Sequence, residues 1–465
     1  MNIILIKTLQ LLLCLSLLII LHEGGHFGFA KLFKVKVEKF FMFFDYKFHL
    51  FSTRDNWFTR LFPRFKQNET EYGIGWIPLG GYVKIAGMID ESLDVEQMKQ
   101  PAKPDEFRSQ KVWKRFFIMA GGVLMNLLTA FVIYSGIMLF EGEDRLPMRE
   151  IKQGFAFNQE AEALGFRDGD IPIRFDNDEI EGWTSALRQD ICKAHTVTVL
   201  RQGKEVTIPM PEGGLNLLDV IYMQPPFIAP LMSTLVDSVF EGSAAAKAGF
   251  VPGTRVLAVE GTPIQYRNDY DSLLLRRQDV LAMKSCTHAD SIKQRTLSFV
   301  VQRSEEAAPD TVSVLLDENL MLGVQFHWDY EVEHIDYNLL TCIPAGLKYG
   351  WETLANYVDS FRYIATPQGA KEVGSFIAIG NLFPDSWDWL RFWMLTAFIS
   401  IALAVMNILP IPGLDGGHIV ILLYEAITGR QPSEKVMLWF EYIGMGLIIA
   451  LMLLAFGNDI RRFLL

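Results

Sequence analysis

The first apolar stretch of the chain ends in a short polar motif, LHEGGHFGFA, with two histidines and one glutamate. His22 and His26 are four residues apart, so a helix places both imidazoles on one face, about one turn apart. Two imidazoles in this arrangement can share one metal ion, and Glu23 can act as a base toward water beside that ion. A catalytic zinc site needs three protein ligands and one open position, so a third ligand must come from elsewhere.

A carboxylate near the other end of the chain is the candidate for that third ligand. Asp415 lies in the stretch NILPIPGLDGGH, from Asn407 to His418, directly after another long apolar run. Pro410 and Pro412 are expected to break the helix there, and broken backbone at membrane depth is tolerated where it lines a cavity. His418 is a rival third ligand. An Asp-Gly loop just outside the membrane, without a metal, is the alternative interpretation.

The alternative for the two histidines is an interfacial pair at a helix end that binds nothing. A charged side chain within a span costs several kcal/mol, and residues of this kind mark functional sites. Gly24 and Gly25 also weaken a helix by about 1 kcal/mol each relative to alanine. These small residues indicate a place where another backbone or a substrate approaches closely.

Four apolar segments are long enough to position these residues in a membrane, since a helix needs about 20 mainly apolar residues to cross the hydrocarbon core. Of the 465 residues, 50% are hydrophobic and only 21% are charged, with the apolar excess at the two ends. The sequence therefore predicts a polytopic α-helical membrane protein with a soluble middle. A signal peptide at the start is the alternative, although no small-residue cleavage site follows it. The four segments are 3–21, 116–140, 392–409 and 442–456.

The basic residues set the expected orientation. Four lysines lie within 31–39, after the first segment, and three basic residues lie within 111–115, before the second. The connection between them, and with it the metal-ligand motifs, is therefore expected on the cytosolic side. The middle of the chain is then outside, in the periplasm of a bacterial inner-membrane protein.

Composition excludes other classes. The net charge of −11 argues against a nucleic-acid binder, which would need a basic patch. Four scattered cysteines are too few for a disulfide scaffold. Cys192 and Cys286 fall in the outer part of the chain and could form a disulfide, but two unpaired thiols are an equal alternative.

Two segments of the soluble middle match at a spacing of 84 residues: ALGFRDGDIPIRFDNDEI (163–180) and KAGFVPGTRVLAVEGTPI (247–264). Each copy has one glycine that suits the end of a short helix and a second that suits the tight turn before a strand. These are Gly165 and Gly169 in the first copy and Gly249 and Gly253 in the second. The pattern resembles the PDZ domain, twice, whose groove adds a peptide as an extra strand. A generic pair of small β-rich domains is the alternative.

The HExxH motif at the end of a first span, combined with NxxPxPxLDG after a third, resembles the site-2 proteases, the M50-type intramembrane zinc metalloproteases. The resemblance covers nearly the whole chain. It implies hydrolysis of a peptide bond at a Zn²⁺ site, with Glu23 as general base and then acid, and with Asn407 engaging the substrate. Implied substrates are single-span membrane proteins of the anti-sigma-factor type, and remnant signal peptides, after another protease has removed their external domain. The PDZ grooves would bind new C-termini or act as a size filter; the oligomeric state stays open.

A segment between the first two spans, GIGWIPLGGYVKIAGM (73–88), resembles the membrane-associated β-hairpin of this family. The exposed edge of a strand is a template for another extended chain. Since a helical substrate must be unwound before it is cut, the hairpin edge is expected to hold it. A purely structural hairpin is the alternative.

The second span departs from the family pattern. It carries AGGVLMN, where Gly122 stands in place of the usual proline and Asn126 lies one residue further along. The role of Asn126 therefore stays open, and packing of small residues against the first span is the plainest use of this stretch.

Two competing functions are an inactive membrane-anchored PDZ scaffold and a metal transporter. The scaffold would leave Glu23 and Asp415 unexplained. The transporter would need polar residues along several spans, and the second and third spans have almost none.

The predicted organisation and site are as follows. The domains are 1–35 (first transmembrane helix), 36–111 (cytosolic segment with the hairpin 73–88), 112–141 (second helix), 142–230 (first PDZ), 231–335 (second PDZ), 336–390 (connector with an amphipathic helix), 391–428 (third helix) and 434–458 (fourth helix). The site residues are Glu23 for catalysis, His22, His26 and Asp415 for zinc, and Asn407, Pro410, Pro412, Gly80, Gly81 and Tyr82 for the substrate.

Overall fold

The computed structural model describes residues 3–78, 80–88, 101–180, 182–183, 187–281, 288–304, 306–364, 366, 369 and 374–463. The chain divides into two compact units. One combines Met1–Gly142 with Asp336–Leu465 and is called the membrane unit below; the other, Glu143–Ile335, is called the repeat unit. Cys286 lies outside the described residues, so its pairing with Cys192 stays a prediction.

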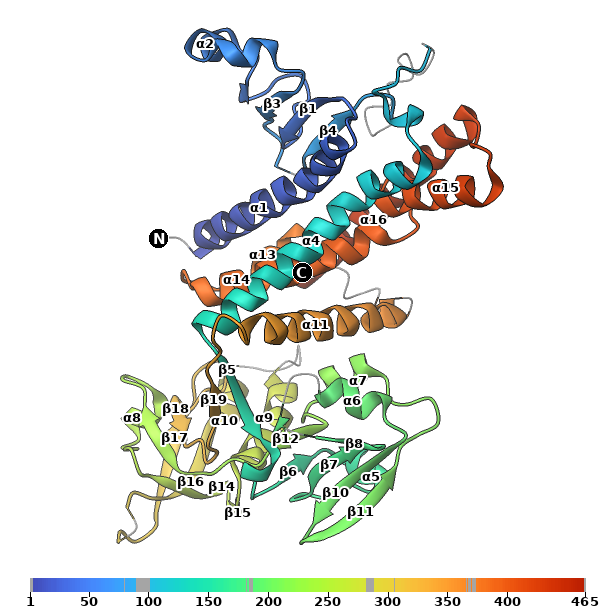
Figure 1. Ribbon diagram of the computed structural model, residues 1–465. Helices are drawn as coiled ribbons and strands as arrows, with labels where there is room; N and C mark the ends of the chain where they lie inside the picture. The colour runs from blue at the N-terminus through green and yellow to red at the C-terminus, as the bar shows by residue number, and fades with distance from the viewer. Residues whose placement is uncertain are drawn as a thin grey trace. The chain divides into compact units, whose positions relative to one another are not determined.

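Among the described residues, four helices of the membrane unit are long and apolar enough to cross a membrane (Figure 1). They are α1 (Ile3–Leu32), α4 (Val112–Phe140), α14 (Trp389–Ile408) and α16 (Glu434–Phe463). Their number and positions confirm the expected multi-pass membrane protein. The shorter helices of this unit are α2 (Asn56–Leu61), η1 (Pro63–Gln67), η2 (Phe107–Ser109), α11 (Cys342–Ile364), α13 (Phe376–Leu382) and α15 (Asp415–Thr428).

Helix α4 is the element on which the others assemble, since α1, α11, α14 and α15 all pack against it. Glycines bring α1 and α4 into backbone contact. A Cβ atom at Gly25 would lie 2.1 Å from the carbonyl oxygen of Gly121, and one at Gly121 would lie 2.6 Å from that of Gly25. Small residues of this kind let membrane helices approach closely, so this crossing requires glycine on both helices.

The chain breaks between α14 and α15, as the two prolines predict. Helix α14 ends at Ile408 and α15 begins at Asp415, so the predicted third-helix segment 391–428 contains two helices. Gly416 is tucked under the break, where an added Cβ would lie 2.1 Å from the carbonyl oxygen of Leu409. This turn places a carboxylate at the start of a new helix.

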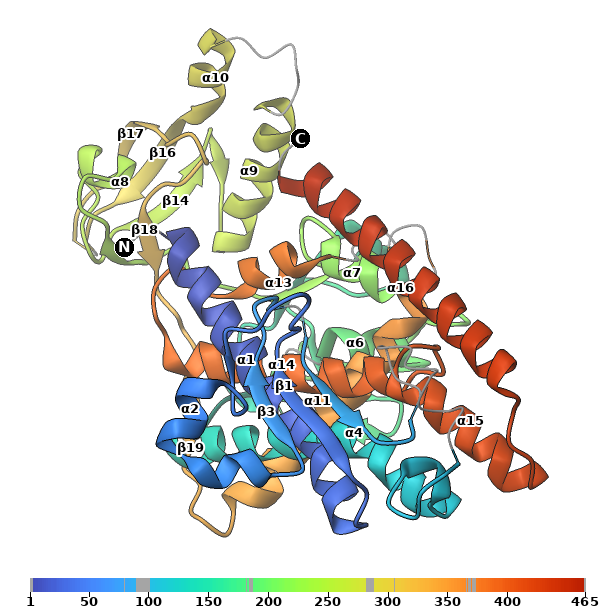
Figure 2. The same ribbon diagram turned by 90° about the horizontal axis from the view of Figure 1, so that it is seen from above.

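A small sheet lies beside α1 (Figure 2). Its strand order is β2-β3-β1-β4, with β1 parallel to β3 and antiparallel to β4. The strands are β1 (Val37–Met42), β2 (Phe51–Ser52), β3 (Glu71–Ile74) and β4 (Tyr82–Ile85).

The predicted pairing within the hairpin 73–88 is therefore wrong, because β1 separates β3 from β4. The connection between them is longer than the two-residue turn of a tight hairpin, and it pairs with the chain that follows β1. The Gly75 N–H donates to the Met42 carbonyl at 2.9 Å, and Phe44 forms a bridge with Ile77. As a result, β4 is an edge strand of a four-stranded sheet.

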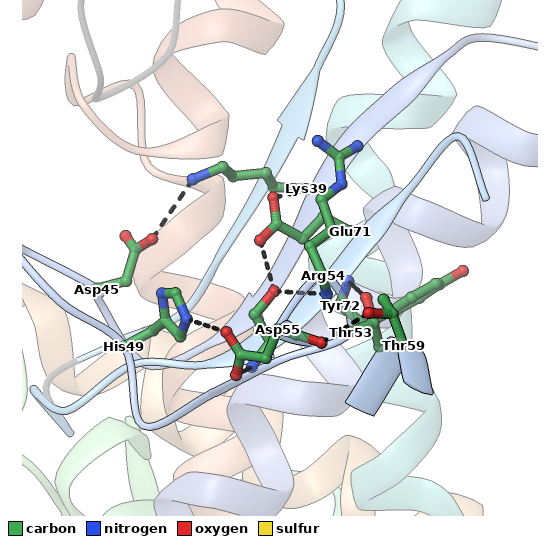
Figure 3. Close-up of polar contacts among 10 residues, drawn as sticks. Lys39, Asp45, His49, Thr53, Arg54, Asp55, Thr59, Glu71 and Tyr72 are labelled. Carbon is green, nitrogen blue, oxygen red and sulfur yellow. Dashed lines mark hydrogen bonds and ion pairs between the residues drawn. The ribbon is translucent and has the colours of Figure 1, made fainter. Parts of the chain in front are cut away.

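Polar contacts hold the β1–β3 connection on this sheet (Figure 3). The Ser52 hydroxyl donates to Glu71 Oε1 at 2.6 Å, and the Ser52 N–H donates to Asp55 Oδ2 at 2.9 Å. His49 Nε2 lies 2.9 Å from Asp55 Oδ1. Desolvation raises the pKa of Asp55, but the hydrogen bonds from His49 and Ser52 outweigh it and hold that pKa below its usual value. The long connection is thereby ordered next to β3.

The repeat unit contains the same arrangement twice. The sheet orders β8-β7-β10-β11 and β15-β14-β16-β17 are equivalent, and β6 pairs with β12 as β13 pairs with β18. The first copy has β6 (Phe155–Phe157), α5 (Gln159–Leu164), β7 (Ile171–Phe175), β8 (Asp178–Glu179), α6 (Leu187–Lys193), β10 (Thr196–Arg201), β11 (Lys204–Pro209), α7 (Leu217–Tyr222) and β12 (Ile228–Pro230). The second has β13 (Val236–Val239), α8 (Ala244–Lys247), β14 (Arg255–Val259), β15 (Thr262–Pro263), α9 (Arg267–Leu281), α10 (His288–Arg295), β16 (Thr296–Gln302), β17 (Asp310–Leu315) and β18 (Val324–Phe326). A further sheet, β19-β5-β9, is formed by Glu333–Ile335, Glu143–Pro147 and Gly182–Trp183, and η3 spans Met148–Glu150.

Local chemistry repeats with the topology. Asn158 caps α5 by accepting the Ala161 N–H, and Ser243 caps α8 by accepting the Ala246 N–H. The four predicted turn glycines all have positive φ, which confirms the expected helix ends and turns. The angles are +113° at Gly165, +87° at Gly169, +78° at Gly249 and +88° at Gly253.

One buried ion pair fastens the first copy. Asp170 is 1% exposed and receives two hydrogen bonds from Arg201, from Nε at 2.7 Å and from Nη2 at 2.6 Å. The Arg167 N–H donates to the same carboxylate at 2.9 Å. Both oxygens of this buried group are therefore satisfied.

Candidate active site

The structure brings the three predicted metal ligands together from opposite ends of the chain. The Nε2 atoms of His22 and His26 are 3.3 Å apart. Asp415 Oδ2 lies 3.3 Å from the first of these nitrogens and 3.4 Å from the second. The three side chains form a group whose ligand atoms all lie within 4.8 Å of one another.

The hydrogen bonds around this group fit a metal ion. His26 Nδ1 is 2.8 Å from the Ile118 carbonyl oxygen, which can only accept, so the neutral ring carries its proton on Nδ1. Its Nε2 then presents a lone pair to the group. Asp415 Oδ2 is buried and has no hydrogen-bond partner among the described residues. A lone pair and a carboxylate oxygen without a hydrogen bond that face each other in this way fit a cation, and two imidazoles with one carboxylate suit zinc.

Gly122 on α4 keeps the space beside both imidazoles open. A Cβ atom there would lie 2.4 Å from His22 Cε1 and 2.5 Å from His26 Nε2. Both distances are below any normal contact, so an alanine at this position would push against the ligand set. Glycine at position 122, where the family usually has proline, therefore has a steric reason in this chain.

Two further residues of α4 contact the site or its supports, and the sequence assigned a role to neither. Asn126 is fully buried, and its Nδ2 lies 3.1 Å from His22 Nδ1. Arg115 forms a short ion pair with Glu425 of α15, and the two side chains are 8% and 11% exposed. This pair ties the helix that begins at Asp415 to α4. In the sequence, a polar residue within an otherwise apolar span was the signal that could have indicated a role for Asn126.

A cavity of about 840 Å³ surrounds the group and contains most of the predicted site residues. Glu23 lines it, and Asn407 places its Nδ2 3.5 Å from His22 Nε2. His418 also lines the cavity but lies outside the group of three. Pro410 and Pro412 lie in the break between α14 and α15 and are not among the lining residues, so their contact with the substrate stays a prediction.

The edge strand β4 forms one wall of this cavity. Gly80, Gly81 and Tyr82 line it, as predicted, together with Val83, Lys84 and Ile85. A Cβ atom at Gly81 would lie 3.4 Å from Glu23 Cγ and 2.6 Å from a methyl group of Ile19. The start of the strand therefore packs directly on α1 beside the glutamate, and it does so because Gly81 has no side chain.

Comparison with known proteins agrees with this site. The model of peptidase family M50 matches residues 10–451. A Neisseria meningitidis protein named "Putative zinc metalloprotease" is 27% identical, and the alignment covers 98% of this chain and 99% of that protein. Proteins named regulator of sigma E protease from Haemophilus influenzae and Salmonella typhi are 24% and 26% identical; 97% of this chain is covered in each case, with 98% and 97% of theirs. Since the family match spans nearly the whole chain, including all three candidate ligands, this membrane protein belongs to peptidase family M50 and is a zinc metalloprotease.

Proposed function

We propose that the enzyme cuts single-span membrane proteins within the membrane, in the manner of the site-2 proteases. The observation that carries this proposal is the position of the cavity. It is lined by α1 and α4, two of the helices that can span a membrane, and it holds His22, His26 and Asp415 beside Glu23. A peptide bond must therefore reach the metal from within the bilayer or through the sheet beside it.

The side chains have separate roles in this proposal. His22, His26 and Asp415 hold the zinc ion, which supplies a Lewis acid for the attacking water and the scissile carbonyl. Glu23 accepts a proton from that water and later delivers it to the leaving amine. Asn407 has its amide 3.5 Å from His22 Nε2, and in this proposal it would donate a hydrogen bond to the substrate.

The substrate binds as an extended strand along β4. A helical substrate hides its peptide bonds, whereas an edge strand offers unpaired N–H and C=O groups to an extended one. Gly81 lets the start of this strand lie close to Glu23, and Tyr82 is fixed by donating its hydroxyl to Asp45 at 3.0 Å. In this proposal, strand β4 holds the extended substrate, a function that the sequence analysis assigned to the edge of a hairpin.

The repeat unit selects substrates. Its two copies correspond to the predicted PDZ domains, 142–230 and 231–335, whose grooves would bind a new C-terminus or exclude large external domains. The relatives named regulator of sigma E protease support anti-sigma-factor-type substrates, which have lost their external domain to an earlier protease. By the distribution of lysine and arginine, the repeat unit is periplasmic, and the metal lies toward the cytosolic side of a bacterial inner membrane.

The test is the Glu23→Gln variant, compared with wild type for accumulation of membrane-stub fragments in cells and for zinc content after purification. We expect zinc content and fold to be unchanged, because all three metal ligands remain. Proteolysis should fall by at least about 100-fold, in line with loss of a general base. Cleavage near the wild-type rate with full zinc content would remove Glu23 from the mechanism.

A further inference from the structure

We propose that Asn126 is a positioning residue that fixes the tautomer of His22, so that its Nε2 is free to bind the metal. The inference rests on the proposed metal site and assigns a task to a side chain that touches a ligand without being one. In chemical terms, the amide oxygen of Asn126 accepts the proton of His22 Nδ1.

Helix α4 provides an outer partner to each imidazole. His26 Nδ1 is 2.8 Å from the Ile118 carbonyl, and His22 Nδ1 is 3.1 Å from the Asn126 amide. Carbonyl groups of a helix point toward its C-terminus, whereas side chains lean toward its N-terminus. The carbonyl of residue 118 and the side chain of residue 126 therefore converge on the middle of the segment, where Gly122 leaves room for both rings.

The chemistry of a neutral imidazole dictates which amide atom faces His22. A ring that binds a metal through Nε2 must carry its proton on Nδ1, and the outer partner of such a ring is an acceptor. The Ile118 carbonyl meets this requirement for His26. Asn126 meets it for His22 only through Oδ1, because Nδ2 is a donor and would leave the ring protonated on Nε2.

The hydrogen-bond inventory is compatible with exchange of the two amide atoms, and the metal-binding tautomer of His22 is the reason for it. In the orientation given, Nδ2 faces His22, while Asn126 Oδ1 is buried and has no partner among the described residues. The oxygen and nitrogen of an amide are assigned from the network around them, and a half-turn of the group interchanges them. That turn gives the buried oxygen the imidazole proton as a partner, takes the imidazole contact from Nδ2, and leaves a lone pair on His22 Nε2.

The backbone around Asn126 holds its helix in place for this task. The Ser400 hydroxyl on α14 donates to the Asn126 carbonyl at 2.8 Å, and both residues are fully buried. Helix α4 is thus bound to α14 at the residue whose side chain reaches α1. A buried polar side chain held in this way in an apolar span has to serve a partner, and His22 is the partner within reach.

The experiment measures zinc affinity of the full-length purified protein by competition with a chelator. Outer hydrogen bonds to metal ligands are worth about 10- to 100-fold in metal affinity. We expect Asn126→Leu, which is similar in size, and Asn126→Ala to bind zinc about 10- to 100-fold more weakly than wild type. Asn126→Asp keeps an acceptor oxygen, so it should bind zinc within about threefold of wild type or more tightly.

Thr129→Val is the matched control, because it removes a different buried polar group from α4, a hydroxyl that among the described residues bonds only to the Met125 carbonyl. Its zinc affinity should equal that of wild type, and unfolding of each variant in excess chelator reports its metal-free stability. Wild-type affinity in both Asn126→Leu and Asn126→Ala would overturn the proposal. So would an Asn126→Asp variant that is folded and as weak as Asn126→Leu, since packing would then explain the effect. His22→Ala separates this result from failure of the metal site itself: if His22→Ala also binds zinc normally, the site is wrong.

Discussion

Two aspartates with buried carboxylate oxygens, one in each unit, have opposite surroundings. Asp170 in the repeat unit receives three hydrogen bonds, two of them from Arg201. Asp415 in the membrane unit has an oxygen that accepts none among the described residues, although two imidazole nitrogens lie within 3.4 Å of it. A buried charge is costly unless it is paired. We therefore expect the satisfied carboxylate to serve the fold and the unsatisfied one to bind a ligand.

The two aspartates also differ in how far along the chain their partners lie. Asp170 and Arg201 belong to one copy of the repeat and lie close in sequence. Asp415 reaches its partners across almost the whole chain, at the start of a helix that exists because the chain breaks before it. Stability is thus built locally in the repeat unit, whereas the metal site depends on the assembly of α1, α4 and α15.

The largest effect is expected for Asp415→Ala. Loss of one of three proposed ligands should weaken zinc binding by more than about 100-fold, the upper range for loss of an outer hydrogen bond. Stability in excess chelator should be unchanged or higher, because an unpaired buried carboxylate has been removed. Chelator competition and thermal unfolding test the two statements. Full zinc content in Asp415→Ala would break the comparison, since the carboxylate would then not be a ligand.

A smaller effect is expected for Asp170→Ala, which should lower the stability of the fold without changing zinc binding. We expect the repeat unit to lose about 2–3 kcal/mol of unfolding free energy, less than a fully buried pair would cost because the Arg201 side chain is 20% exposed. Zinc affinity should not change. Hydrogen exchange over 143–335 measures the local stability.

The control for Asp170→Ala is Asp310→Ala, which breaks an exposed pair with Arg303 in the other copy. That change should cost clearly less stability than Asp170→Ala, because solvent screens the exposed pair. Equal costs for the two variants would show that burial does not distinguish them.

The smallest effect on the metal is expected from removal of the whole repeat unit. Glu143 and Ile335 are directly paired across β5 and β19, so a short glycine-serine linker from Gly142 to Asp336 can replace everything between. Zinc affinity should stay within about threefold of wild type, because every proposed ligand remains. The variant should now cut substrates that still carry their external domain. A deletion protein that binds zinc but still rejects those substrates would refute the filter.

The sequence predicted the ligands and the repeat because both have short-range signatures. HExxH spacing, the proline break before Asp415 and the paired turn glycines are each contained in about ten residues. The order of strands in the small sheet was missed, because local alternation does not reveal that β1 inserts between β3 and β4. Asn126 and Gly122 were left without a role for a similar reason. Their function depends on which helix lies against α4, and an apolar span has no pattern that specifies its neighbour.

The distance along the chain between the two halves of the metal site has a consequence for biogenesis. The contact between His22 and Asn407 joins residues 385 positions apart, and Asp415 is made later still. At about 5–20 residues per second, synthesis of that interval takes roughly 20–80 s. During this time the nascent chain has its imidazoles and its glutamate in the bilayer but lacks the carboxylate. With Asp415 as the proposed third ligand, a nascent chain that ends before this residue lacks a complete metal site and should be unable to cut its neighbours in the membrane.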